Sequence, residues 1–253
     1  MVALRNVAWW SEATRTGRPA APADDVAVPA AGQRRGQWSE DAARRMLRDA
    51  GIPVAPAWLA GSADDAVKVA AEIGGLLAVK LVSPEILHKS GIGGVRLGVP
   101  ADEDAIRDAY RAVTAAAAAV GGAHVEGVLI SPMRDGGAEL LVGVVRDPQW
   151  GPMLAVALGG ILVEVLADSV LAPLPITPAQ AGSLLEKLRG APVLRGAAPA
   201  GLAALAAVIA RVGDLAVALG DDLESLEINP LRVDGDTIEA LDAVVTWIPK
   251  GQN

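Results

Sequence analysis

Hydrophobic positions along the chain recur with two different spacings, which predict helices and strands in a mixed order. Apolar residues three and four positions apart predict amphipathic helices, and short β-branched runs predict strands. Capping residues followed by acidic residues or proline mark three helix starts, at Ser39, Ser62 and Thr177. The predicted helices span 39–50, 62–73, 101–120, 177–190 and 199–220, and the predicted strands span 54–60, 76–82, 94–99, 125–132, 138–147 and 152–160.

The end of the chain, residues 225–245, predicts two further strands joined by a tight Asp-Gly turn. Because helices and strands are mixed without strict alternation, we expect an α+β fold. The folded part is predicted over residues 38–248, with lobes at about 53–126 and 127–248 that meet near residue 130. Residues 16–37 are rich in Pro, Ala, Gly and charge, and a short apolar segment with Trp9 and Trp10 precedes them. Residues 1–37 are therefore predicted to be a linker or docking tail.

Composition narrows the class of protein. Hydrophobic residues make up 52% of the 253 positions but aromatic residues only 3%, so the core must be aliphatic. The formal net charge of −8 disfavours nonspecific binding to nucleic acid or anionic membranes, and we expect neither as a partner. The absence of cysteine excludes disulfides and thiolate ligands and fits the cytoplasm. The apolar stretch 153–172 is interrupted by glycines and acidic residues, which favours a buried strand and helix over a membrane span.

The first lobe carries two candidate sites for an anion. Lys80 lies inside an apolar strand, where a lysine either snorkels from an edge strand or meets an anion such as phosphate. The following sequence "HKSGIGG" contains Gly91, Gly93 and Gly94, whose backbone N–H groups could surround an anion, although a glycine-rich hairpin without a ligand fits as well. His88 beside it could be a general base, a nucleophile that accepts a phosphoryl group, or a polar loop residue.

A second group of polar residues lies near the end of the chain. Glu227 and Asn229 are two positions apart on a predicted strand and share a face, and a hairpin can place Asp242 opposite Asn229. Oxygen ligands of this kind suit Mg²⁺, although ordinary polarity of an outer strand face is the alternative. Together with Lys80 and the glycine-rich loop, these residues predict ATP chemistry with Mg²⁺.

Several segments, in their order along the chain, resemble a known family. The blocks "SPEILHKS…GGV" and "EINPL", with "EGVLISPM" and "ALDAVV", resemble the ATP-grasp domain of NDP-forming acyl-CoA synthetases. This group includes ADP-forming acetate–CoA ligase and succinyl-CoA synthetase. The similarity runs from about residue 38 to 247. It implies an ATP-grasp fold, in which two α+β lobes clasp a nucleotide.

The resemblance also implies an activity and residue roles. The enzyme would be an acid–thiol ligase that converts ATP, a carboxylate and CoA to ADP, phosphate and acyl-CoA through phosphohistidine, with His88 as a relay. Lys80 would bind the ATP phosphates, and Asn229 and Asp242 would bind Mg²⁺, supported by Glu227. Segment 129–133 would be the inter-lobe connection whose backbone contacts adenine. The other residues expected to bind the nucleotide are Lys89, Ser90, Gly93, Gly94, Ser131, Met133, Glu139, Gly159, Gly160 and Glu164.

The same resemblance implies a partner. No segment resembles the CoA-binding or phosphohistidine module of the family, so we expect an α-type subunit or a fused N-terminal module to bind most of the carboxylic acid and CoA. A hetero-oligomer is therefore expected. Two positions depart from the family pattern: Gly91 stands where relatives usually carry Asp, and Ala172 where they often carry Arg.

Two other functions remain open at the level of sequence. A non-catalytic ATP-grasp domain could sense nucleotides for a partner, and would keep Lys80 and the Mg²⁺ ligands without phosphoryl transfer through His88. An ATP-grasp ligase that joins a carboxylate to an amine is the third hypothesis. The histidine block argues against it, because capture of an acyl phosphate by an amine needs no histidine relay.

Overall fold

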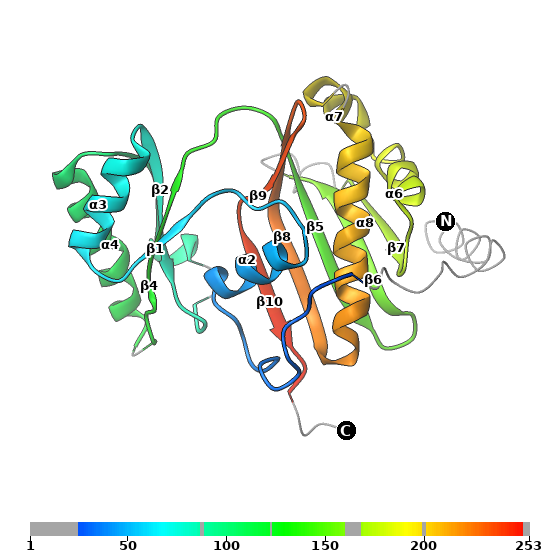
Figure 1. Ribbon diagram of the computed structural model, residues 1–253, viewed down its shortest axis with the longest axis horizontal. Coiled ribbons are helices and arrows are strands. Elements are labelled where there is room, and N and C mark those ends of the chain that lie inside the picture. The colour runs from blue at the N-terminus through cyan, green and yellow to red at the C-terminus, as the bar shows by residue number, and fades with distance from the viewer. Residues whose placement is uncertain (1–24, 87–88, 122, 160–167, 199–200, 250–253) are drawn as a thin grey trace.

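The chain folds into two lobes, each built on its own antiparallel sheet (Figure 1). The computed structural model describes residues 25–249 except 87–88, 122, 160–167 and 199–200. The smaller lobe lies on the left of Figure 1 and the larger lobe on the right, where α8 crosses in front of the sheet. The architecture is the predicted α+β class.

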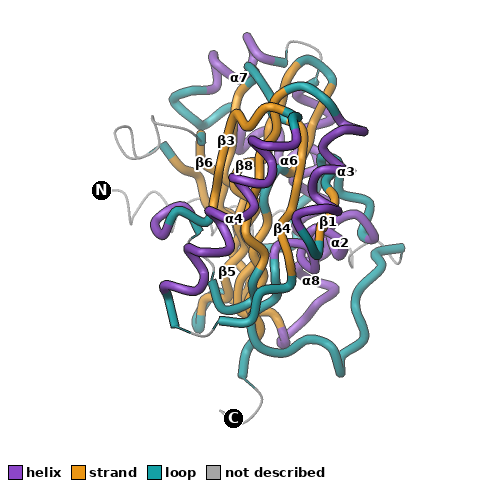
Figure 2. The backbone as a smooth tube through the Cα atoms, turned by 90° about the vertical axis from the view of Figure 1, so that its left-hand side faces the viewer, coloured by secondary structure: helices purple, strands orange, loops and turns teal. Residues whose placement is uncertain are grey.

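The small lobe contains a four-stranded sheet in the order β1-β4-β2-β3. Two helices, α3 and α4, cover one face of it and form the outer layer in Figure 2. The covered face is aliphatic, with Leu77, Val79 and Ile130 fully buried against Ile106 of α4. Its elements are β1 Trp58–Ala60, α3 Ala63–Ile73, β2 Leu76–Val82, η1 Ser90–Ile92, β3 Val95–Pro100, α4 Glu103–Ala119 and β4 Gly127–Pro132.

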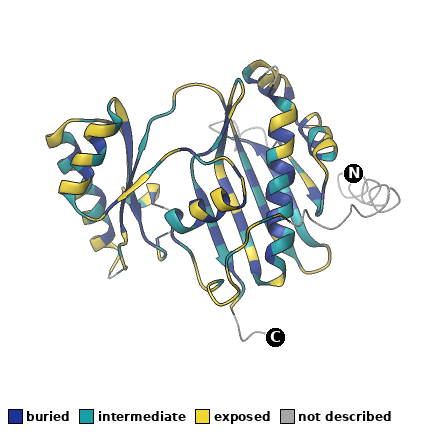
Figure 3. Cartoon of the chain, viewed as in Figure 1, coloured by how far each residue is buried: buried dark blue, intermediate teal, exposed yellow. Residues whose placement is uncertain are grey.

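The large lobe contains a six-stranded sheet in the order β10-β8-β5-β6-β7, with β9 paired to β8. Helix α8 packs on β8, β5 and β6 beside α6, and α2 packs on β10. Figure 3 shows the inner side of α8 and the strands beneath it as largely buried. The elements are α2 Glu40–Asp49, β5 Ala138–Asp147, β6 Gly151–Leu158, β7 Ser169–Pro173, α6 Pro178–Leu185, α7 Ala191–Ala197, α8 Leu202–Leu219, η2 Gly220–Asp222, β8 Leu223–Asp234, β9 Thr237–Ala240 and β10 Ala243–Trp247.

Two boundaries differ from the predicted ones. Strand β4 pairs with β1 and β2, so the chain changes lobe at 133–137 and not at 127. The predicted connection 129–133 is therefore mostly strand, because Ile130, like Val128 just before the segment, packs in the small-lobe core. The predicted strand 54–60 is reduced to β1, since Pro56 lacks a backbone donor and Val54 bridges to Ala240 of the large lobe.

One helical segment among the described residues, Leu202–Asp222, is long and apolar enough to cross a membrane by length and composition. Within the fold, its Leu205, Ile209 and Leu215 are fully buried in the core of the large lobe. The apolar character of α8 is accounted for by this packing.

Candidate functional site

Lys80 lies in the interior of the small sheet and not on an edge strand. It sits on β2, opposite Leu129 of β4 and Val95 of β3. Its ammonium group lies 3.0 Å from Oδ2 of Asp242, 3.2 Å from Oε1 of Glu40 and 3.2 Å from the carbonyl oxygen of Leu241. An ammonium group has three N–H donors, so these three acceptors account for all of them. Lys80 therefore bridges the two lobes.

Glu40 is the centre of this charged cluster, which we define as Glu40, Arg44, Lys80, Lys89 and Asp242. Its side chain is 0% exposed, and Oε2 accepts a 2.6 Å hydrogen bond from Nζ of Lys89. The Arg44 guanidinium lies 3.8 Å from Oε1 of Glu40 and donates to the carbonyl oxygens of Leu241 and Ala55. Three cations against two carboxylates leave a net positive charge at the junction of the lobes.

The ionisation of the cluster follows from burial and pairing. Burial alone would raise the pKa of Glu40, but the charges of Lys80 and Lys89 outweigh it and hold this pKa below its usual value. Burial by itself would lower the pKa of Lys80, but the nearby Glu40 and Asp242 carboxylates outweigh burial and hold this pKa above its usual value. Burial and the nearby Glu40 carboxylate raise the pKa of Asp242 against the opposing effect of Lys80. Lys80 and Glu40 are thus a charged pair at neutral pH.

The predicted metal ligands come together at the middle of one hairpin. Ile228 pairs with Ala243, and the backbone N–H of Asn229 donates to the carbonyl oxygen of Asp242 at 3.2 Å. The Asn229 side-chain amide donates to Oε1 of Glu227 at 3.1 Å. Carboxylate and amide oxygens are hard ligands, so this donor set fits Mg²⁺. In the part of the chain that the structure describes, no group of three or more His, Cys, Asp or Glu side chains is arranged to hold a metal ion. The predicted set is of a different kind, because one of its three members, Asn229, contributes an amide in place of a carboxylate.

Pro230 explains why the cluster can use a main-chain oxygen. The N–H of Leu241 donates to the carbonyl oxygen of Pro230, but proline has no N–H to return the bond. The Leu241 carbonyl oxygen is left available and accepts from Arg44 and Lys80. The "EINPL" block therefore supplies both Asn229 and an acceptor for Lys80.

The glycine-rich loop forms a compact turn. The N–H groups of Gly93 and Gly94 donate to the carbonyl oxygens of Ser90 and Lys89, and Gly93 has φ +80°. These donors are used within the turn, so the predicted backbone cradle for an anion is not formed by Gly93 and Gly94 in this structure. Ser90 is exposed in the same turn, and the site instead receives the Lys89 ammonium group. His88 lies outside the described residues.

The residues predicted to contact the nucleotide base lie along β4 and just beyond it. Ser131 pairs with Ala78 and shares the sheet face of Lys80. The backbone N–H of Met133 donates to the carbonyl oxygen of Leu76 at 2.9 Å. Just after it, Arg134 forms two hydrogen bonds to Glu239, at 2.8 and 3.0 Å, which tie the inter-lobe connection to β9.

Glu139 and Gly159 lie side by side in the large sheet. The Gly159 N–H donates to the carbonyl oxygen of Glu139, and a Cβ at Gly159 would lie 2.9 Å from the Glu139 backbone. Only glycine therefore fits there without a shift of the backbone. The predicted residues Gly160 and Glu164 lie outside the described residues, so the structure brings Glu139 together with Gly159 alone.

The two departures from the family pattern have different surroundings. Ala172 of β7 is 0% exposed and pairs with Leu154, so this chain packs a small side chain into the core at that position. Gly91 is exposed in the turn, and nothing lies within 4 Å of a Cβ built there. Packing therefore explains alanine at 172 and leaves glycine at 91 unexplained.

Sequence reasoning missed Glu40 and Arg44 as site residues. It assigned Glu40 only to the first turn of a helix, next to Asp41. A signal was present, because Glu40 lies three and seven positions before Ala43 and Leu47, on the apolar stripe. A carboxylate on a buried stripe needs a partner.

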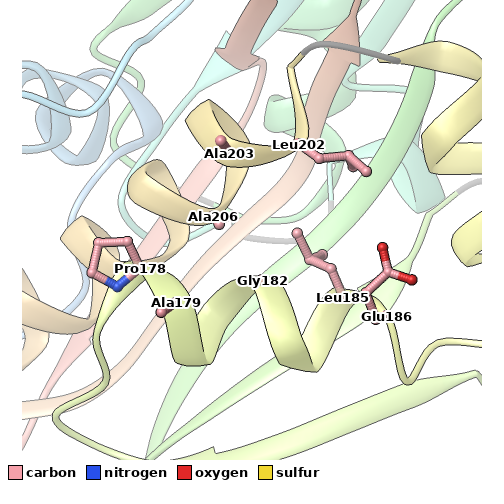
Figure 4. A pocket seen from close by; sticks show the side chains of 8 residues that line it. All are labelled: Pro178, Ala179, Gly182, Leu185, Glu186, Leu202, Ala203 and Ala206. Atoms are coloured by element: carbon pink, nitrogen blue, oxygen red, sulfur yellow. The ribbon is translucent and has the colours of Figure 1, made fainter.

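A groove between α6 and α8 lies apart from the charged cluster (Figure 4). Its one ionisable side chain is Glu186, which is paired with Arg195 at 2.5 Å. Its lining is otherwise apolar, so it offers no group for polar chemistry. The lining residues are Pro178, Ala179, Gly182, Leu185, Glu186, Leu202, Ala203 and Ala206.

Comparison with known proteins places this chain in a family. The family model of the ATP-grasp domain matches residues 29–247. The β subunit of ADP-forming acetate–CoA ligase I from Pyrococcus furiosus is 38% identical over 208 residues, which cover 81% of this chain and 89% of that subunit. The ADP-forming acetate–CoA ligase I of Archaeoglobus fulgidus is 37% identical over 191 residues, which are 74% of this chain but 28% of that protein.

The solved structures agree with this assignment. The dinucleotide forming acetyl-coenzyme A synthetase 1 of Ca. Korarchaeum cryptofilum, in complex with coenzyme A and Ca-AMPCP, superimposes with a TM-score of 0.78. Its sequence is 28% identical, and the match covers 95% of this chain and 98% of that chain. The chain therefore belongs to the ATP-grasp family, among the β subunits and β-type domains of ADP-forming acyl-CoA synthetases.

Proposed function

We propose that this chain is the nucleotide-binding part of an ADP-forming acyl-CoA synthetase and acts with a partner that binds CoA and the carboxylic acid. The observation that carries the proposal is the meeting of two small-lobe lysines with large-lobe carboxylates: Lys80 pairs with Asp242, beside Asn229, and Lys89 pairs with Glu40. Transfer of a phosphoryl group needs charge neutralisation and fixed positioning more than covalent assistance. The two lysines would neutralise charge on the phosphates, and their fixed place beside the proposed Mg²⁺ ligands would position the phosphoryl group.

The reaction transfers the terminal phosphoryl group of ATP to His88. A neutral ring nitrogen of His88 forms the N–P bond while the bond between the γ-phosphorus and its bridging oxygen breaks, and ADP leaves. The phosphoryl group then passes to the partner and to the carboxylate, which becomes an acyl phosphate. The CoA thiol displaces phosphate, so that ATP, carboxylate and CoA yield ADP, phosphate and acyl-CoA.

The other residues of the site bind and orient the nucleotide. Lys80 contacts the phosphates, and Lys89 and Ser90 add polar groups next to the histidine. Ser131 and Met133 lie at the end of β4, where the adenine would meet the inter-lobe connection. Glu139, Gly159, Gly160 and Glu164 are the residues proposed to line the large-lobe side of the nucleotide.

Glu227, Asn229 and Asp242 are the residues that would hold Mg²⁺. Mg²⁺, when bound, would neutralise charge on the phosphates and restrict their orientation. The side chains of Asn229 and Asp242 take opposite positions of one hairpin, so both can face the same ligand.

A histidine-trapping experiment tests the proposal. The purified chain is mixed with the proposed α-type partner, Mg²⁺ and γ-labelled ATP, and labelled protein is separated before and after acid treatment. We expect acid-labile, base-stable label on the wild type and none on His88→Ala. His124→Ala is the matched control, because His124 is the other histidine of the chain and is exposed.

Two results would contradict parts of the proposal. Equal labelling of wild type and His88→Ala would exclude His88 as the relay. Nucleotide binding without label on either protein, with the partner present, would remove the catalytic proposal and favour a nucleotide-sensing domain.

A further inference from the structure

A buried carboxylate connects the two lobes at the site, and the reaction above gives it no role. Glu40 belongs to α2, which packs in the core of the large lobe. Its two oxygens accept from Lys80 and Lys89, which both belong to the small lobe. The side chains of these lysines are only 13% and 7% exposed, so each ammonium group needs an acceptor within the protein.

The three hydrogen-bond acceptors of the Lys80 ammonium group differ in how easily a ligand can replace them. The Glu40 side chain is 0% exposed, and the Leu241 carbonyl oxygen belongs to a hairpin that Arg44 also holds. The Asp242 side chain is 28% exposed. A phosphate that approaches from solvent can therefore replace Asp242 on Lys80 with the least rearrangement.

We propose that Glu40 is a positioning residue that holds the Lys80 and Lys89 ammonium groups between the lobes while Lys80 exchanges Asp242 for a nucleotide phosphate. The inference rests on the proposed function, since it requires Lys80 to contact that phosphate. The exchange keeps the buried ammonium group paired before and after binding. It also frees the Asp242 carboxylate for a cation that arrives with the nucleotide.

Loss of the Glu40 charge affects both lysines at once. A glutamine at position 40 accepts hydrogen bonds through one oxygen only, because its nitrogen is a donor. One lysine then faces a donor, and Asp242 becomes the only carboxylate partner of Lys80. The Lys80–Asp242 pair would tighten and compete with the incoming phosphate, so nucleotide binding should weaken.

Asp41 is a matched control on the same helix. It is the next residue in the first turn of α2, where both carboxylates interact with the same helix N-terminus. Asp41 pairs with Arg45 at 3.2 Å, and the Arg45 side chain is 62% exposed. Asp41→Asn therefore removes an equal charge without touching Lys80 or Lys89.

Titration calorimetry of Mg²⁺·ADP into the full chain tests the inference. We expect Glu40→Gln to raise the Kd about tenfold or more, because a hydrogen bond to a charged group is lost. For Asp41→Asn we expect a Kd within about twofold of wild type. The number of sites per chain should stay unchanged, whereas a purely structural defect would lower the number of sites and leave the Kd of the remaining molecules alone. A Kd for Glu40→Gln within about twofold of wild type overturns the inference.

A second variant covers the case in which Glu40→Gln does not fold. Glu40→Asp keeps the charge but is one methylene shorter, so it cannot reach both lysines equally well. We expect its Kd to rise about threefold to tenfold at full stoichiometry, and an unchanged Kd would overturn the inference. If the wild type itself does not bind Mg²⁺·ADP, the proposed function fails; if the wild type binds and the Glu40 variants match it, the inference fails alone.

Discussion

The charged cluster at the junction of the lobes and the groove between α6 and α8 differ in what their side chains can do. In the cluster, five charged groups pair with one another or with main-chain oxygens, and the central one is fully buried. In the groove, the lining is apolar except for Glu186, which lies at one end of it and already has a surface partner (Figure 4). Burial of a charged group costs free energy, so the buried charged cluster is a stronger indication of a functional site than the apolar groove.

Other buried polar groups show what a structural role looks like in this molecule. Asp168 accepts hydrogen bonds at 2.8 Å from the backbone N–H groups of Arg189 and Gly190. Arg232 donates to the carbonyl oxygens of Asp135 and Gly136. Asp168 holds a turn of its own lobe and Arg232 holds the inter-lobe connection, each through main-chain groups, whereas Glu40 and Lys80 pair charged side chains from opposite lobes.

The largest effect should follow from Lys80→Met, which removes the charge and keeps most of the aliphatic stem. We expect the Kd for Mg²⁺·ATP to rise about a hundredfold or more, because a charge-assisted contact to phosphate is lost in a partly desolvated site. Equilibrium titration measures this. Lys68→Met is the control, since Lys68 is 75% exposed on α3. Wild-type affinity in Lys80→Met would show that the cluster is structural, like Asp168.

Asp242→Asn should have a smaller effect that depends on the metal. With Mg²⁺ present we expect nucleotide Kd to rise about tenfold, because the carboxylate that we propose as a Mg²⁺ ligand is lost. In excess EDTA we expect no weakening, because Lys80 is released from its ion pair with Asp242. Asp236→Asn, in the exposed turn after β8, should change neither value. Equal weakening with and without Mg²⁺ would contradict the role of Asp242 as a metal ligand.

The pH dependence of the free energy of unfolding should show whether the ionised form of Glu40 stabilises the fold. The pKa of Glu40 in the folded protein is held below the usual 4.5, so its ionised form stabilises the fold above that value. The contribution of the ionised Glu40 should therefore be lost as the pH falls below 4.5, so the advantage of wild type over Glu40→Gln in free energy of unfolding should shrink there. Denaturant unfolding at several pH values measures it. An advantage that grows as the pH falls below 4.5 would contradict this assignment.

The fold could be predicted from the sequence where the local pattern and the tertiary environment agree. Strands β2 and β5 match the predicted segments residue for residue, because both are rich in Leu and Val and have clear ends. The capping residues Ser39, Ser62 and Thr177 each accept the expected backbone hydrogen bond. The lobe boundary was placed too early because the sequence does not say which sheet β4 joins.

The candidate site was predictable in part. The register of the last hairpin follows from its Asp-Gly turn, so Asn229 and Asp242 could be placed opposite each other in advance. Glu40 could not be paired with Lys80, because 40 residues and a change of lobe separate them. No local pattern indicates that the glycine N–H groups are used within the turn or that the Lys89 side chain reaches Glu40.

The smallest effect is expected on the groove side, from Gly182→Ala. A Cβ at Gly182 would lie 3.8 Å from the Cβ of Ala206, an ordinary contact, and the residue is inside α6. Alanine restricts the unfolded chain, so we expect the free energy of unfolding to rise by about 0.5–1 kcal/mol while nucleotide Kd stays unchanged. Gly159→Ala is the contrast at the site, since its Cβ would press on the Glu139 backbone and should reduce both stability and nucleotide affinity. Denaturant unfolding and titration of both variants separate the two regions, and a change of nucleotide Kd in Gly182→Ala would mean that the groove is coupled to the site after all.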